Sequence, residues 1–281
     1  MEYYITDFNV SNPNAAALED GIMKKGSLTT AGSKMLSRFA ALFDAGVVER
    51  LMGSGVEISG KTKMKEFGMP DFFADPNDGA LSGSAQAVMN NAAAYCLCND
   101  LFGQYRREAA ENRLCYLHPT YGTVSRYGLI PLAASMDQIG ILCKNANDGF
   151  ALLAKISGND ARDGAMFPEK AYSYEKRGKK MRLRVPGNIL RLADEGTREA
   201  VNDFAGKFEA RDESNLEHFG VISPVMYILT CAEISNNLSR YDGVKFGYRA
   251  PGAENLESLY VKTRTEAFGM EAKLAAMMGA A

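Results

Sequence analysis

The sequence has few of the residues on which several common kinds of functional site depend. It has only two histidines, His118 and His218, among 281 residues, and neither is near a serine or cysteine that could form a nucleophile elbow. Its five cysteines are odd in number and irregularly spaced, and the pair Cys96 and Cys98 lacks the further ligands of a zinc site. We therefore expect free thiols in a reducing compartment, no metal and no cofactor.

Long apolar runs and an excess of charge of one sign are also absent. No segment reaches the roughly 18 consecutive apolar residues expected of a membrane span. Residues 1–17 lack the positive start of a signal peptide. With 32 basic and 34 acidic residues the formal net charge is −2, so no overall basic field attracts nucleic acid or lipid. We expect a cytoplasmic protein that contacts no membrane and binds no nucleic acid directly.

What is present indicates a globular α/β domain. Hydrophobic residues make up 46% of the chain and charged residues 23%, which supports a substantial core. Apolar or small side chains at helical spacing predict helices over 33–52, 84–98, 145–156, 197–208 and 254–278. Leu42 is expected on the apolar face of the first of these, Asn145 or Asn147 as the cap of the third, and Thr197 as the cap of the fourth. Short strands are predicted over 56–58 and 181–185, and a loop rich in Pro, Asp and Gly over 70–83.

Spacing and composition by themselves point to no catalytic site. The Gly/Ser-rich segment 79–84 could present backbone N–H groups to an anion, but it lacks the lysine and the glycine spacing of a phosphate-binding loop. A simple helix cap is the alternative for this segment. The adjacent acids Glu19 and Asp20 could be paired carboxylates, or they could mark a turn.

Several long motifs occur in one order along most of the chain. The motifs are 29–36, 47–67, 118–128, 134–140, 238–249 and 263–269. Together they resemble the amidase signature family, and within it the A subunits of glutamyl-tRNA(Gln) amidotransferases. The resemblance implies a mixed sheet flanked by helices, truncated at both ends. It also implies a single domain over 1–281 that lacks the family's C-terminal part.

The family hydrolyses amides with a lysine that takes a proton from a bridging serine, which in turn activates a second serine. Matched to these motifs, the lysine position falls on Glu19, the bridging serine on Ala80 and the nucleophile on Gln104. The turn that should form the oxyanion hole has Phe102 in place of a glycine. We therefore expect no catalytic residue at these three positions.

A residual polar pocket could persist beside the altered positions. Its candidate residues are Asp20, Ser82, Ser84, Asp100, Gly103, Arg126, Asp137 and Gln138. The alternative is that such residues hold turns through hydrogen bonds from side chain to backbone. Rescue of activity would require Ser82 or Ser84 to pair with Lys24 or Lys25.

Three functions follow from the resemblance. The first is a non-catalytic paralogue of these A subunits with a binding or regulatory role. The second is an active glutamine-dependent amidotransferase or amidase that uses altered residues, and the third is a relic without a selected role. The apolar end of the last helix, around Leu274 and Met278, predicts a homodimer or an amidotransferase-type partner subunit.

Overall fold

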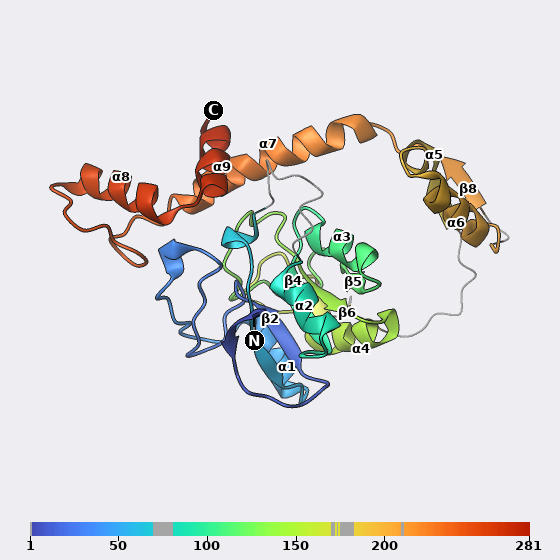
Figure 1. Ribbon diagram of the computed structural model, residues 1–281, viewed down its shortest axis with the longest axis horizontal. Coiled ribbons are helices and arrows are strands. Elements are labelled where there is room, and N and C mark those ends of the chain that lie inside the picture. Colours follow the sequence, from blue (N-terminus) through green and yellow to red (C-terminus); the bar gives the residue numbers. More distant parts are fainter. Residues whose placement is uncertain (1, 70–80, 170–171, 173, 175–182, 209–210) are drawn as a thin grey trace. The chain divides into compact units, whose positions relative to one another are not determined.

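The computed structural model describes residues 2–69, 81–169, 172, 174, 183–208 and 211–281 (Figure 1). Contacts within the chain divide it into two compact units. Unit 1 is Met1–Ser173 with Thr230–Ala281, and unit 2 is Tyr174–Leu229. One domain over residues 1–281 stays a prediction, since contacts alone do not test whether either unit folds without the other.

Unit 1 is built on a six-stranded mixed sheet with the order β1-β3-β2-β4-β6-β5. Strands β2 and β4 are parallel neighbours, and β2 is also parallel to β3; the other pairs are antiparallel. Because parallel neighbours end at the same edge of a sheet, the C-terminal ends of β2 and β4 meet. The strands are β1 Tyr4–Asp7, β2 Ala16–Glu19, β3 Ile58–Thr62, β4 Tyr95–Asn99, β5 Cys115–Leu117 and β6 Ile139–Cys143.

Four helices pack around this sheet. Helices α2 (Gly83–Met89) and α3 (Gln104–Glu111) share one apolar cluster with β2, β4 and β6. Helix α4 (Ala146–Ile156) packs on β5 and β6, with α1 (Gly46–Gly53) beside it. The residues of β2, β3 and β6 are buried throughout, so these strands carry the core.

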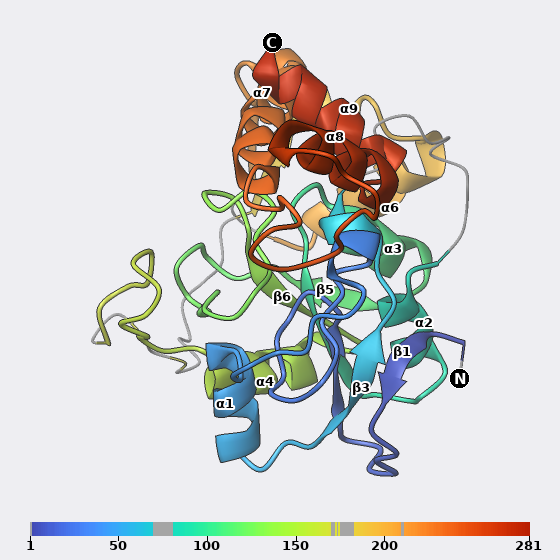
Figure 2. The same ribbon diagram turned by 90° about the vertical axis from the view of Figure 1, so that its left-hand side faces the viewer.

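A second cluster joins helices from the end of the chain to loops near its start. Helices α8 (Leu256–Ala267) and α9 (Met270–Ala280) lie together with the C-terminal half of α7 (Phe219–Leu238) in Figure 2. Their apolar residues pack against Met35 in the 3-10 turn η1 (Lys34–Leu36) and Phe67 in η2 (Glu66–Gly68). The C-terminal motifs of the sequence thus complete a core begun by the N-terminal ones.

The described residues of unit 2 form a two-stranded parallel pair, two short helices and the N-terminal part of α7. The pair is β7 (Leu183–Pro186) with β8 (Arg211–Ser214), and the helices are α5 (Gly187–Leu190) and α6 (Glu195–Ala205). The predicted strand over 181–185 is confirmed from Leu183 onward, whereas its first two residues lie outside the described residues. Asp194 caps α6 by accepting hydrogen bonds from the backbone and hydroxyl of Thr197 at 2.9 and 2.6 Å. The prediction that Thr197 itself is the cap was wrong.

Three predicted helices are shorter or broken. Over 33–52 only η1 and α1 are helical, because Ala40 pairs with Leu28 in an isolated bridge between them. The predicted helix over 84–98 ends at Met89, and its last residues form the buried strand β4, since small side chains suit a packed strand as well as a helix. The stretch over 254–278 is divided between α8 and α9 at Gly269.

Other predictions agree with the structure in part. Of the two caps expected for α4, Asn145 and Asn147, the structure has Asn145, which accepts a hydrogen bond from the Asp148 backbone. The strand predicted at 56–58 overlaps β3 (Ile58–Thr62) only at Ile58, so its position was wrong by most of its length. Of the predicted loop over 70–83, residues 70–80 lie outside the described residues and α2 begins at Gly83.

Helix α7 was not predicted from the sequence. Among the described residues it is the one helix long and apolar enough to cross a membrane by length and composition, with a mean hydropathy of 1.2 and 17% of that window buried. The expectation that no segment meets this criterion was wrong. Pro224, Thr230 and Glu233 interrupt its apolar runs, yet the average over the window stays high. Core helices of soluble proteins pass the same test, so this finding alone assigns no membrane span.

Substitution of Gly83 tests the packing of α2 on the edge of the sheet. A Cβ at Gly83 would lie 2.7 to 2.9 Å from backbone atoms of Tyr3 and Lys63, which cannot rotate away. We expect Gly83→Ala to lower the free energy of unfolding by about 1–3 kcal/mol in denaturant titrations. The matched control is Gly53→Ala, also in a helix but with no atom within 4 Å of its Cβ. That control should be neutral or stabilising by up to about 1 kcal/mol. Equal losses for the two variants would contradict the close packing.

Candidate functional site

The candidate site lies where β2 and β4 end and where α2 and α3 begin. Glu19 is the last residue of β2 and Asn99 the last residue of β4, so the parallel pairing of the strands brings them together. Helix α3 then starts at Gln104, after Gly103 in a left-handed conformation with φ of 84°. Glycine adopts that conformation without strain, which accounts for Gly103 in this turn.

The carboxylate of Glu19 is buried and held on both oxygens. One oxygen accepts the backbone N–H of Asn99 at 2.7 Å, and the other accepts the hydroxyl of Tyr105 at 2.5 Å. Glu19 is 1% exposed, and this burial raises its pKa to about 7, aided by the charges of Asp100 and Asp20 and opposed by the two hydrogen bonds. Both charged and neutral forms of Glu19 are therefore populated near neutral pH.

Gln104 belongs to a hydrogen-bonded group centred on Glu108. Its amide donates to one oxygen of Glu108 at 2.9 Å, and the hydroxyl of Ser82 donates to the other at 2.5 Å. Ser82 also caps α2 by accepting the backbone N–H of Ala85 at 3.1 Å. Gln104, to which the resemblance assigns the nucleophile position, thus offers an amide, and the hydroxyl of Ser82 is already bound to a carboxylate.

The space between these groups is almost filled. The cavity bounded by Glu19, Asn99, Phe102, Gln104 and neighbouring described residues has a volume of about 10 Å³. Roughly that volume is needed to hold a single water molecule. Phe102, which the resemblance places at a glycine position of the family, lines this cavity with its side chain. The position matched to the bridging serine, Ala80, lies outside the described residues.

Asp20 faces a buried lysine that the sequence analysis did not single out. The Nζ atom of Lys61 lies 3.1 Å from a carboxylate oxygen of Asp20, and both side chains are buried. Lys61 also donates to the hydroxyl of Thr29 at 2.7 Å and to the carbonyls of Asp20 and Leu28 at 3.0 and 2.8 Å. Burial lowers the pKa of Lys61 to about 8, and the charge of Asp20 opposes this shift. The sequence could have pointed to Lys61 through its place in the motif over 47–67.

Two of the other candidate residues line a different pocket from the one at Glu19. Arg126 and Asp137 line a separate pocket of about 250 Å³, in which Arg126 binds Asp163 with contacts of 2.7 and 3.0 Å. Asp137 accepts hydrogen bonds from Asn99 and the backbone of Leu132, and burial raises its pKa to about 6.

Several of the candidate residues hold the local backbone or a neighbouring side chain. The backbone N–H of Gln138 donates to the Asn99 side chain at 2.8 Å, and its own amide donates to the carbonyl of Pro119. Asp100, which borders the small cavity, accepts the Nε of Arg106 at 2.9 Å. These contacts fit the alternative in which such polar residues hold turns.

The pairs proposed to rescue activity are not assembled in the described residues. The hydroxyl of Ser84 is buried and bonds with Thr62 at 2.8 Å, whereas Ser82 bonds with Glu108. The ammonium of Lys24 lies 4.7 Å from the centre of the Phe8 ring, and Lys25 is exposed. No described hydrogen bond joins either serine to either lysine.

The raised pKa of Glu19 predicts a change of stability with pH. The folded state binds the Glu19 proton more tightly than the unfolded state, so this contribution to stability is complete at low pH and is lost as pH rises through about 7. Glutamine cannot ionise. We therefore expect the free energy of unfolding of Glu19→Gln, relative to the parent, to increase by about 2 kcal/mol from about pH 5 to about pH 8.

Urea titrations of both proteins across this range would measure the difference. Glu49→Gln is the control, because its hydrogen bond with Arg162 lowers the pKa of Glu49 and so keeps its titration below this range. Its difference from the parent should stay constant. A constant difference for Glu19→Gln as well would contradict the raised pKa.

Comparison with known proteins identifies the family. The family model described as Amidase matches residues 16–71 and 79–281. Over 93% of its length the chain is 38% identical to the A subunit of the glutamyl-tRNA(Gln) amidotransferase of Ligilactobacillus salivarius. It is 39% identical to the corresponding protein of Listeria monocytogenes, also over 93%. It spans 58% and 59% of the length of these relatives.

Solved structures give the same result. The A subunit of the glutamyl-tRNA(Gln) amidotransferase of Thermotoga maritima matches with a TM-score of 0.68 and 27% identity, covering 84% of this chain and 59% of that one. A peptide amidase of Stenotrophomonas maltophilia matches in fold with a TM-score of 0.72 and 23% identity, covering 95% of this chain and 61% of that one. The predicted mixed α/β fold is thereby confirmed, and the chain belongs to the amidase family.

Proposed function

We propose that this chain is a non-catalytic member of the amidase family, related to the A subunits of glutamyl-tRNA(Gln) amidotransferases, with a binding or regulatory role. The proposal rests on the position and the hydrogen bonds of Glu19. It stands where the resemblance places the family's lysine, and both of its oxygens are held by Asn99 and Tyr105.

The chemistry of the site supports this proposal. A serine hydroxyl is a weak nucleophile unless a base lies within hydrogen-bond reach. Gln104 offers an amide in place of the hydroxyl, and the cavity beside it holds about 10 Å³, too little for an amide substrate. The turn after β4 carries the side chain of Phe102 at the place where backbone N–H groups would approach an oxyanion.

A second candidate is an active amidase or glutaminase with altered residues. The specific observation in its favour is the hydrogen bond of 2.5 Å between the hydroxyl of Ser82 and the carboxylate of Glu108. A carboxylate can act as a general base for a hydroxyl. However, the same oxygen of Ser82 caps α2, so attack on a substrate would uncap that helix.

A glutaminase assay separates the two candidates. We expect purified protein to release no more ammonia from glutamine than a protein-free blank, because no activated hydroxyl among the described residues faces an open site. Turnover that Ser82→Ala abolishes, and that the matched surface variant Ser54→Ala retains, would overturn the proposal in favour of an active enzyme. Circular dichroism of both variants controls for folding.

We further propose that the chain works in the cytoplasm, joined to an amidotransferase-type partner subunit or to a second copy of itself. The relatives are named as subunits of an amidotransferase, and the chain spans 58% of their length. Its last helix leaves Met277 and Met278 at 69% and 50% exposure, and exposed apolar surface of this kind favours association. A relic with no role would show no such association.

Sedimentation of the chain alone and with the other subunits of an amidotransferase tests the association. We expect a dimer or a complex, and we expect Met278→Glu to weaken it because a charge would enter the apolar contact. Met52→Glu, on the exposed side of α1 with 52% exposure, is the matched control and should change nothing. A monodisperse monomer in both experiments would contradict the proposal.

A further inference from the structure

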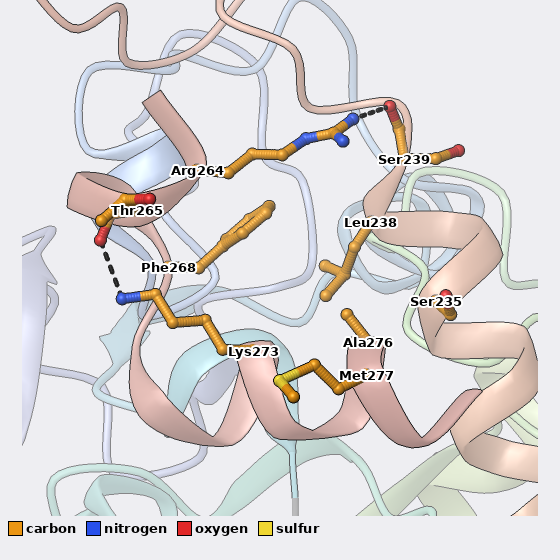
Figure 3. A pocket seen from close by; sticks show the side chains of 9 residues that line it. All are labelled: Ser235, Leu238, Ser239, Arg264, Thr265, Phe268, Lys273, Ala276 and Met277. Atoms are coloured by element: carbon orange, nitrogen blue, oxygen red, sulfur yellow. Dashed lines mark hydrogen bonds between the residues drawn. The ribbon is translucent and has the colours of Figure 1, made fainter. Parts of the chain in front are cut away.

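Unit 1 contains a larger pocket away from Glu19, enclosed by α7, α8 and α9. Its volume is about 460 Å³, within the range of about 300–1,000 Å³ typical of sites for small molecules. Figure 3 shows the ring of Phe268 between the side chains of Arg264 and Lys273, facing Leu238. The described residues that line it are Ser235, Leu238, Ser239, Arg264, Thr265, Phe268, Lys273, Ala276 and Met277.

The charged side chains that line this pocket are all positive. Arg264 and Lys273 are its ionic groups, and no aspartate or glutamate is among its described lining residues. The nearby Glu66 instead accepts the backbone N–H of Gly269 at 2.8 Å and the hydroxyl of Ser33 at 2.6 Å. Burial raises the pKa of Glu66, and the charge of Lys273 opposes that shift. The pocket therefore attracts an anion.

Both cations are held in place by neutral acceptors. Arg264 donates to the carbonyls of Tyr241 and Ser239 at 3.1 and 2.8 Å, and Lys273 donates to the carbonyl of Thr265 at 2.8 Å. Carbonyls orient these groups without neutralising their charge. A guanidinium has five N–H donors and an ammonium three, so each side chain has further donors for a ligand. Such orientation reduces the entropy lost when a ligand binds.

The other side of the pocket is apolar. Leu238, Phe268, Ala276 and Met277 form a surface that would bury an aliphatic or aromatic group beside the two cations. A purely polar anion would leave this surface in contact with water, and a cation would be repelled by both charged groups.

We propose that this pocket binds an amphipathic organic anion, with a carboxylate or phosphate group at Arg264 and Lys273 and an apolar body against Phe268 and Leu238. The site is independent of the altered catalytic positions. We expect the same binding whether the chain is an active enzyme or a non-catalytic protein.

Titration calorimetry with defined probes tests the proposal on the full chain. We expect decanoate or decyl phosphate, below the concentration at which they form micelles, to bind at one site per chain, and the comparison of the two identifies the preferred head group. Acetate and inorganic phosphate test the head group alone, and decyltrimethylammonium tests the tail with the opposite charge. We expect none of these three to bind measurably. The proposal would be overturned if neither decanoate nor decyl phosphate bound, or if decyltrimethylammonium bound as tightly as these anions.

Two pairs of variants locate the binding. Lys273→Gln should lower the affinity for the preferred anion about tenfold, since it removes one charged hydrogen bond. Lys262→Gln is its matched control, because Lys262 also donates to one backbone carbonyl, that of Gly252, but does not line the pocket. Ala276→Phe should block binding by filling the pocket, whereas Ala280→Phe, exposed on the same helix, should not.

Circular dichroism verifies that each variant folds. If Ala276→Phe does not fold, the lysine pair still decides the outcome. An equal effect of Lys273→Gln and Lys262→Gln on binding would place the anion elsewhere and overturn the proposal.

Discussion

The need to satisfy the buried carboxylate of Glu19 organises the site around it. A charged or half-charged carboxylate without hydrogen bonds would be costly in this position, because water is excluded. The parallel pairing of β2 and β4 supplies one donor, the backbone N–H of Asn99. Helix α3 supplies the other, the hydroxyl of Tyr105. The start of α3 is thereby tied to the end of β2.

The neighbouring acid is satisfied in a different way, and the difference follows from strand geometry. Successive residues near the end of a strand point to opposite faces, so Glu19 and Asp20 have different surroundings. Asp20 accepts the backbone N–H of Thr30 at 2.8 Å and faces the ammonium of Lys61 at 3.1 Å. Lys61 in turn holds the segment from Asp20 to Thr29 through three further hydrogen bonds. Burial of this pair contributes more to fixing the loop than to chemistry, since each partner would be costly without the other.

The sequence predicted the parts of this protein that depend on long motifs, and it failed where tertiary contacts outweigh local pattern. The mixed α/β fold and helix α4 were correct, and Asn145 is one of the two caps expected for that helix. The helix over 33–52 was wrong because Leu42, placed on its apolar face, is 76% exposed and the segment before it pairs with Leu28. Tyr105 was not singled out, since nothing in a single sequence shows that a tyrosine beside the altered nucleophile position reaches a glutamate 86 residues away. The pocket at Arg264 was missed for the same reason, because it forms only when α7, α8 and α9 come together.

The surroundings of Glu19 fit a glutamate and not the lysine that the resemblance to the family leads us to expect at this position. Two donors, the N–H of Asn99 and the hydroxyl of Tyr105, point at position 19. A lysine there would direct an ammonium, which has donors and no acceptor, at those two groups. The tyrosine hydroxyl could turn to accept, but the backbone N–H of Asn99 could not, and it would be left buried without a partner. Gln104, which lines the same small cavity, bonds instead to Glu108. Glu19 and Gln104 thus have separate hydrogen-bond partners, and we propose that amide hydrolysis at this site would require several coordinated substitutions.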